Sequence, residues 1–171
     1  MLRLMLHSGY FGFSSIYCVI KLNTDGGISS ANSVAGIGFV MRCDDGSVMV
    51  AGSKRVAYAS SVIEIEAYAI LWAIQVALSK GFMNVILETD SRILVDALLH
   101  NKELLHIRGL FLHLRRLCGL FTLCSWSFVR RDGNRVAHEL ASRALYNQDE
   151  VYDGFVPASI SSWVLKDVRP L

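Results

Sequence analysis

Three acidic residues stand at positions that a purely structural role does not explain. Asp25 closes an alternating segment directly before Gly26-Gly27, where the missing side chains leave room for a ligand or an ion. Glu66 lies on the apolar face of an amphipathic segment, and Asp90 follows the apolar run Val85–Leu87. A carboxylate on an apolar face is costly unless a cation or hydrogen bonds compensate it, so these acids are candidates for a ligand site.

The chemistry of such a site follows from the charge of its members. Grouped carboxylates repel one another, and they therefore favour hard divalent cations with oxygen ligands, Mg²⁺ or Mn²⁺. Two such ions about 4 Å apart activate a water and stabilise the leaving oxygen in phosphodiester hydrolysis. Structural alternatives stay open, since Asp25 also fits an Asp-Gly turn and Asp90 or Ser91 also fits a helix cap.

Three strands are expected in the first third of the chain. Alternation over Val19–Asp25 predicts a strand that carries Asp25 near its end. Ala35–Arg42 and Ser47–Arg55 predict two more strands, joined at Asp44-Asp45-Gly46 by a hairpin turn of the aspartate–glycine type. The economical arrangement is three antiparallel strands.

A long helix is expected next, capped by Ser60 or Ser61 and ended at Lys80 by Gly81. At about 100° per residue, Glu66 falls in the middle of its apolar face. That face is formed by Ile63, Ile70, Ala73, Ile74 and Ala77. Glu64 lies on the opposite stripe and is expected to be an ordinary surface acid, so Glu66 is the helical residue that points at the sheet.

The remaining pattern predicts a strand over Asn84–Thr89 and another over Thr122–Val129, with helices over Ser91–His100, Lys102–Leu117 and Asn134–Tyr146. This order describes a mixed sheet covered by helices, an α/β fold. We expect one domain over residues 19–146 and a tail over 147–171 that packs on it. Residues 1–18 are expected to be a lead-in, either unstructured or targeting.

Composition narrows the class of protein. The chain has 171 residues, 53% of them hydrophobic and 19% charged, which predicts one domain with a sizeable core and excludes a disordered chain. No run approaches the roughly 18 apolar residues of a membrane span, so no membrane partner is expected. The cysteines lack metal or disulfide spacing and indicate thiols in a reducing, intracellular compartment, nucleus or cytoplasm. They are Cys18, Cys43, Cys118 and Cys124.

The net charge of +2 alone would argue against a dedicated nucleic-acid binder. Its distribution argues the other way. Between Asn101 and Tyr146 eight basic residues face three acids, a local balance of +5 that leaves −3 for the rest. Arg115-Arg116 and Arg130-Arg131 are expected to contact phosphates, which gives affinity without sequence readout, although solvated helix faces remain the alternative.

Five strings, in this order and spacing, resemble the type 1 ribonuclease H domain. They are KLNTDGG, AGIGFVMR, EIEAYAILWAI, VILETDS and RRDGNRVAHELASRA. More narrowly, the chain resembles the plant reverse-transcriptase-like, retrotransposon-derived members, over about Lys21–Leu145 and again in the tail Pro157–Asp167. The resemblance implies a ribonuclease H-like fold with a five-stranded mixed sheet in the order 3-2-1-4-5. It also implies two-Mg²⁺ endonucleolytic hydrolysis of the RNA strand of RNA–DNA hybrids.

The resemblance assigns catalytic and metal-binding roles to four positions. The acids of the family fall on Asp25, Glu66 and Asp90, and a fourth position, an Asp in the family, is His138 here. Imidazole is a poorer ligand for Mg²⁺ than a carboxylate, but it accepts Mn²⁺. His138 is therefore expected to bind a metal weakly, hold a water or shuttle a proton; otherwise it marks a weakened or inactive domain that only binds nucleic acid.

Smaller polar residues complete the expected interface with an RNA–DNA hybrid or other nucleic acid, bound by a monomer. Asn23, Asn32 and Ser91 are candidates for contacts to the backbone or to ribose 2′-hydroxyls, which distinguish RNA from DNA. Gly26 and Asn134 lie in the matched strings and are expected at the same interface. A different class, a nucleotide-binding protein using Gly36-Ile37-Gly38, lacks the helix start that a phosphate cradle requires.

Overall fold

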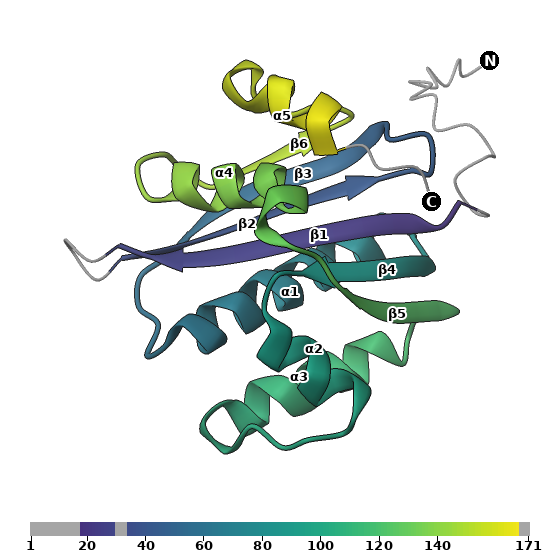
Figure 1. Ribbon diagram of the computed structural model, residues 1–171, viewed down its shortest axis with the longest axis vertical. Helices are drawn as coiled ribbons and strands as arrows, with labels where there is room; N and C mark the ends of the chain where they lie inside the picture. Colours follow the sequence, from purple (N-terminus) through teal and green to yellow (C-terminus); the bar gives the residue numbers. More distant parts are fainter. Residues whose placement is uncertain (1–17, 30–33, 168–171) are drawn as a thin grey trace, which may run out of the picture.

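A computed structural model describes residues 18–29 and 34–167 of the chain. Its six strands form one sheet in the order β5-β4-β1-β2-β3-β6 (Figure 1). The strands are β1 (Ile20–Ile28), β2 (Ala35–Arg42), β3 (Val48–Val56), β4 (Asn84–Thr89), β5 (Leu123–Phe128) and β6 (Glu150–Asp153). The helices are α1 (Val62–Ser79), α2 (Arg92–Leu99), α3 (Arg108–Cys118), α4 (Arg135–Ala144) and α5 (Ser161–Asp167). The expected mixed α/β architecture is confirmed.

The sheet is mixed in direction. β1 runs antiparallel to β2 and parallel to β4, β2 and β3 are antiparallel, and β4 and β5 are parallel. These five strands have the expected order 3-2-1-4-5. The count of five is corrected to six, because β6 pairs antiparallel with the free edge of β3, with Val50 opposite Asp153 and Ser53 opposite Glu150.

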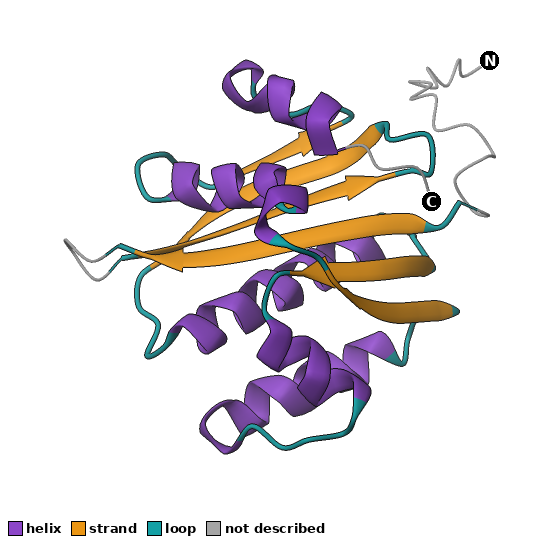
Figure 2. Cartoon of the chain, viewed as in Figure 1, coloured by secondary structure: helices purple, strands orange, loops and turns teal. Residues whose placement is uncertain are grey.

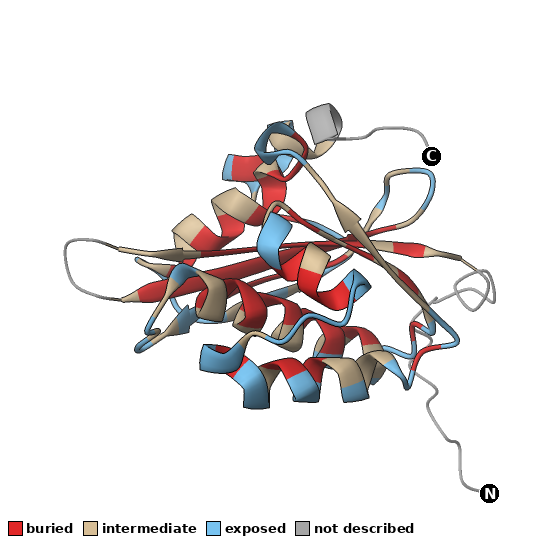
Figure 3. Ribbon diagram, turned by 60° about the horizontal axis from the view of Figure 1, so that its bottom comes forward, coloured by how far each residue is buried: buried red, intermediate tan, exposed pale blue. Residues whose placement is uncertain are grey.

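Helices cover both faces of the sheet (Figure 2). Residues of α1, α2 and α3 share one hydrophobic cluster with Phe39 and Met41 of β2, whereas Val40 belongs to a second cluster with α4. Successive side chains of a strand point to opposite faces, so the two clusters lie on the two sides of the sheet. Every residue of β2 is buried as a result, and Figure 3 shows the same burial along the centre of the sheet.

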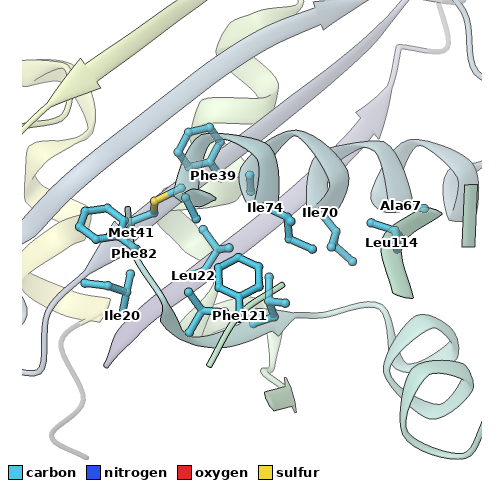
Figure 4. Close-up of a cluster of buried hydrophobic side chains, with 14 of the residues drawn as sticks. Ile20, Leu22, Phe39, Met41, Ala67, Ile70, Ile74, Phe82, Leu114 and Phe121 are labelled. Atoms are coloured by element: carbon cyan, nitrogen blue, oxygen red, sulfur yellow. The ribbon is translucent and has the colours of Figure 1, made fainter. Parts of the chain in front are cut away.

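The larger core fills the space between the sheet and α1 (Figure 4). Ile70 and Ile74 of α1 pack there with Leu22 of β1 and Phe39 of β2, all at most 1% exposed. Each such side chain contributes about 1.5–3 kcal/mol by leaving water. This burial fixes the position of α1, and hence of Glu66, against β1.

The ends and the apolarity of α1 have local explanations. The Ser61 hydroxyl accepts a hydrogen bond from the Glu64 backbone N–H at 3.2 Å, and Gly81, at φ +77°, turns the chain away after the last turn. Among the described residues, α1 is the one helix long and apolar enough to cross a membrane. Eight of its residues are buried inside the protein, which accounts for that apolarity as the packing of a core helix.

Two glycines of β2 admit α4. A Cβ at Gly36 would lie 2.2 Å from the Ala141 carbonyl oxygen, and one at Gly38 would lie 2.4 Å from the Ala141 nitrogen. The Gly36-Ile37-Gly38 string is therefore explained by close packing of helix on strand. The hypothesis that it cradles a nucleotide is not supported, since these residues lie within a fully buried strand.

The segment after α4 packs on the body of the protein. Beyond β6, Val156 and Ile160 join Val40 and Leu140 in the second hydrophobic cluster. The Arg135 guanidinium lies 4.7 Å from the ring centroid of Trp163 in α5. The expected lead-in, residues 1–18, lies almost wholly outside the described residues.

Candidate functional site

Three carboxylates from three elements meet at one point. Asp25 lies in β1, Glu66 in the first half of α1 and Asp90 directly after β4, and one ligand oxygen of each lies within 4.8 Å of the others. The parallel register explains half of this convergence. Thr24 is paired with Thr89, so the residues that follow them, Asp25 within β1 and Asp90 directly after β4, lie side by side.

Glu66 reaches the pair because α1 comes very close to β1. A Cβ at Gly26 would lie 2.8 Å from the carbonyl carbon of Ile65 and 2.9 Å from the Glu66 nitrogen. A side chain at residue 26 would therefore clash with the α1 backbone. Gly26 itself lines the pocket described below, and its contact with nucleic acid stays a prediction. Gly27 has open space around its Cα and lines the pocket described below.

The cluster is electrostatically strained without a cation. Glu66 is 7% exposed, and burial, together with the charges of Asp25 and Asp90, raises its pKa to about 9. Burial and the charge of Asp25 also raise the pKa of Asp90. The Oε2 atom of Glu66 is buried and has no hydrogen-bond partner among the described residues. An all-oxygen set of this kind fits Mg²⁺ or Mn²⁺, which would neutralise the repulsion and occupy the unpartnered oxygen.

His138 contacts this cluster through Asp25. Its Nδ1 lies 2.8 Å from Oδ2 of Asp25, and this hydrogen bond raises the pKa of the imidazole despite its partial burial. The first turns of α4 place it there, across from the acids of α1 and β4. The structure thus brings all four expected catalytic positions together, with His138 bonded to one carboxylate of the cluster.

Asn134 organises the site from within the protein. It is 1% exposed, and its Nδ2 donates to the Thr24 carbonyl at 2.9 Å and to Asp90 Oδ1 at 3.4 Å. These bonds tie the start of α4 to β1 and to the carboxylate of Asp90. The expected contact of Asn134 with nucleic acid is corrected accordingly, because the residue is buried and its Nδ2 is occupied by these two hydrogen bonds.

A pocket of about 750 Å³ opens over the carboxylates. Ser91 and Arg131 line it, and both were expected at the interface; Arg92 also lines it and was not foreseen. The Arg92 guanidinium lies 3.7 Å from the ring centroid of Phe128, which holds it at the rim. The sequence could have indicated Arg92 as a pocket residue, because it lies only two positions after Asp90. Ser91 occupies the N-cap position of α2, as the capping alternative expected, but its side chain makes no capping hydrogen bond.

The other residues expected to contact nucleic acid differ in how exposed they are. Arg116 and Arg130 are exposed and free to meet phosphates. Arg115 donates to the Ala97 carbonyl at 3.3 Å, which gives it a structural role at the junction of α2 and α3. Asn32 lies outside the described residues.

Asn23 is corrected from a contact residue to a buried link. It is fully buried, donates to a Glu88 carboxylate oxygen at 2.9 Å and accepts from Arg42 Nη2 at 2.8 Å. The network joins β4, β1 and β2 and supplies a hydrogen-bond acceptor to a buried arginine. The sequence did not reveal this network because an arginine at the end of a strand is usually exposed to solvent, and nothing in the pattern marks Arg42 as buried.

Comparison with known proteins agrees with this geometry. A family profile described as reverse transcriptase-like matches residues 23–144, more than two thirds of the chain. The chain belongs to the reverse transcriptase-like family. The matched segment of this reverse transcriptase-like domain contains Asp25, Glu66, Asp90 and His138. Among curated proteins no match was found.

Solved ribonuclease H structures resemble the reverse transcriptase-like domain. Ribonuclease H1 of the halophilic archaeon Halobacterium salinarum superposes with a TM-score of 0.69 at 25% identity, over 74% of this chain and 96% of that one. LC11-ribonuclease H1, solved in complex with an RNA/DNA hybrid, superposes with a TM-score of 0.66 at 20% identity, over 73% of this chain and 95% of that one. The N-terminal ribonuclease H domain of a Mycobacterium tuberculosis protein superposes with a TM-score of 0.68 at 20% identity, over 75% of this chain and 94% of that one. The fold is that of ribonuclease H.

Proposed function

We propose that this domain is an endonuclease that hydrolyses the RNA strand of RNA–DNA hybrids with two divalent ions, Mg²⁺ or Mn²⁺. The observation that carries the proposal is the convergence of Asp25, Glu66 and Asp90 within 4.8 Å, with a buried and unpartnered oxygen on Glu66. The likeness to LC11-ribonuclease H1, solved with an RNA/DNA hybrid, supports the substrate class. The motif strings support the finer proposal of a plant, retrotransposon-derived member.

Each residue of the site has a distinct part in the proposed reaction. Bound divalent ions supply Lewis-acid chemistry, which activates a water and stabilises the leaving oxygen. Asp25, Glu66 and Asp90 would hold those ions, and Asn134 orients Asp90 through its Nδ2. Arg131 lines the pocket with its charge available to a phosphate, so it would hold the scissile strand over the acids.

A second candidate function, nucleic-acid binding without turnover, is favoured by one contact. The hydrogen bond from His138 to Asp25 engages Oδ2 of a carboxylate that the reaction would need for metal binding. The proton on Nδ1 competes with a cation for the same oxygen atom. Under this alternative the domain keeps its basic surface and binds hybrids, but it cleaves slowly or not at all.

Hydrolysis of an end-labelled RNA–DNA hybrid, in Mg²⁺ and separately in Mn²⁺, tests both candidates. We expect cleavage by the wild type and by Glu103→Gln, a control that removes one exposed acid outside the pocket. Asp25→Asn is expected to lose cleavage, and cleavage that survives it would refute the site. A wild type that binds without cleaving, with a gain of cleavage in His138→Asp, would instead establish the binding-only alternative.

A further inference from the structure

Two cysteines far apart in sequence meet beyond the end of the β1–β2 pair. Cys18 lies two residues before the start of β1, and Cys43 directly follows β2, 25 positions after Cys18. Their sulfur atoms lie 3.0 Å apart. The antiparallel register, with Lys21 opposite Arg42, is what brings them together. Both side chains are half-buried, so a small reagent can reach them from solvent.

Two chemistries could use such a pair, and the sulfur separation distinguishes them. With Asp44, the two thiols form a set of possible metal ligands within 4.8 Å of one another. Two thiolates on one tetrahedral zinc, each about 2.3 Å from the metal, would lie about 3.8 Å apart. The observed 3.0 Å is shorter than that and lies about 1 Å from the disulfide bond length of about 2.05 Å. The geometry therefore favours a disulfide over a metal.

We propose that Cys18 and Cys43 form a reversible disulfide by exchange with a low-molecular-weight disulfide such as oxidised glutathione. One protein thiol, as the thiolate, attacks a sulfur of the small disulfide, forms a mixed disulfide and releases one reduced thiol. The second protein thiol then attacks the protein sulfur of that mixed disulfide and releases the other reduced thiol. The two protein cysteines are oxidised, one small disulfide is reduced to two thiols, and the two protons pass to those thiols.

The environment of the pair sets the order of the two attacks. Burial first, then the hydrogen bond shared with Cys18 and the nearby carboxylates of Asp45 and Asp44, raises the pKa of Cys43 to about 12. A thiol that keeps its proton is a poor first nucleophile. Cys18 therefore makes the first attack, and Cys43 closes the bond.

The bond would tie the entry of β1 to the β2–β3 hairpin and leave the carboxylate cluster alone. Cys18 lies seven residues before Asp25, most of them in β1, which is roughly 23 Å at about 3.3 Å per residue. Its effect is accordingly expected on stability and not on the site. A second thiol pair, Cys118 and Cys124, shares a hydrogen bond across the end of α3 and the start of β5, so it must be removed to isolate the first.

The test uses the full chain carrying Cys118→Ser and Cys124→Ser, equilibrated with oxidised and reduced glutathione. Mass analysis of the intact protein and its peptides is expected to show a Cys18–Cys43 bond and no retained glutathione. Oxidation is expected to raise Tm by about 5–10 °C. Adding Cys43→Ser should leave glutathione on Cys18 and no rise in Tm.

Three results would overturn the proposal. The first is glutathione retained on Cys18 when Cys43 is present, because the second attack would then not occur. The second is an unreactive pair, with both thiols still free in oxidised glutathione while the unfolded chain reacts. The third is stoichiometric binding of Zn²⁺ by the reduced protein that is lost in Cys18→Ser and in Asp44→Asn, which would assign the pair to a metal.

Discussion

Replacing Glu66 by glutamine is expected to stabilise the protein when no metal is present. The carboxylate of Glu66 is 7% exposed and lies against Asp25 and Asp90, so its ionised form is disfavoured in the folded state. In the unfolded chain the same group ionises freely at its ordinary pKa of 4.5. Folding at neutral pH must therefore add a proton to Glu66, and Glu66→Gln removes that requirement.

The size of the effect follows from the two pKa values. The folded-state pKa of about 9 lies above the unfolded value of 4.5, so the folded state binds the extra proton between them. Stability of the metal-free wild type then falls as pH rises through that window. At pH 7, about 2.5 pH units above 4.5, the penalty is about 3 kcal/mol at about 1.36 kcal/mol per pH unit. Near pH 4.5 the wild type and Glu66→Gln should be almost equally stable.

Urea unfolding in a metal chelator at pH 4.5, 6 and 7 measures this difference. Glu66→Gln is expected to gain stability over the wild type as pH rises, and Mg²⁺ is expected to stabilise the wild type more than the variant. Glu103→Gln, which removes an exposed acid, serves as the control and should match the wild type throughout. A variant less stable than the wild type at pH 7, or a difference that does not change with pH, would refute the reasoning.

Three further predictions concern the neighbours of the cluster. Gly26→Ala should lose about 1–3 kcal/mol of unfolding free energy in urea, because the added Cβ would lie 2.8 Å from the Ile65 backbone. Gly27→Ala is the matched control and should change stability little, because the space around Gly27 is open. Equal losses in the two variants would contradict this prediction. Arg131→Ala should weaken hybrid binding, and it should reduce the slope of log K against log salt concentration by about one, the share of one phosphate contact. Binding titrations at several salt concentrations measure that slope, and an unchanged slope would show that Arg131 does not contact the hybrid. His138→Asp should raise Mg²⁺-dependent cleavage about tenfold or more relative to Mn²⁺-dependent cleavage, and a fall in both would assign His138 a catalytic part.

Local periodicity was sufficient to predict where the acids lie. The helical spacing that placed Glu66 on the apolar face of α1 corresponds to its burial in the structure. Asp25 and Asp90 were predicted to converge because neighbouring strand ends meet at one edge, and the parallel pairing of β1 with β4 has that effect. These predictions rest on patterns within single elements.

What sequence reasoning missed depends on contacts between elements. β6 is only four residues long, too short to show a strand pattern in the sequence, and it forms by pairing with the free edge of β3. Asn23 sits on a strand where polar residues alternate with apolar ones, and only the structure shows that a buried Arg42 occupies its amide oxygen. The proximity of Cys18 to Cys43 likewise follows from strand register, which spacing along the chain does not reveal.

The most direct test of the central claim is cleavage of the RNA strand of a labelled RNA–DNA hybrid by the wild type and by Asp90→Asn. Asp90 is chosen because the hydrogen bond of His138 goes to Asp25, so replacing Asp90 removes one carboxylate of the cluster and leaves the His138–Asp25 contact in place. The account predicts metal-dependent cleavage by the wild type that falls at least 100-fold, on the order of 3 kcal/mol, in Asp90→Asn with hybrid binding retained. Equal cleavage by the two proteins, or none by the wild type in either Mg²⁺ or Mn²⁺, would contradict it.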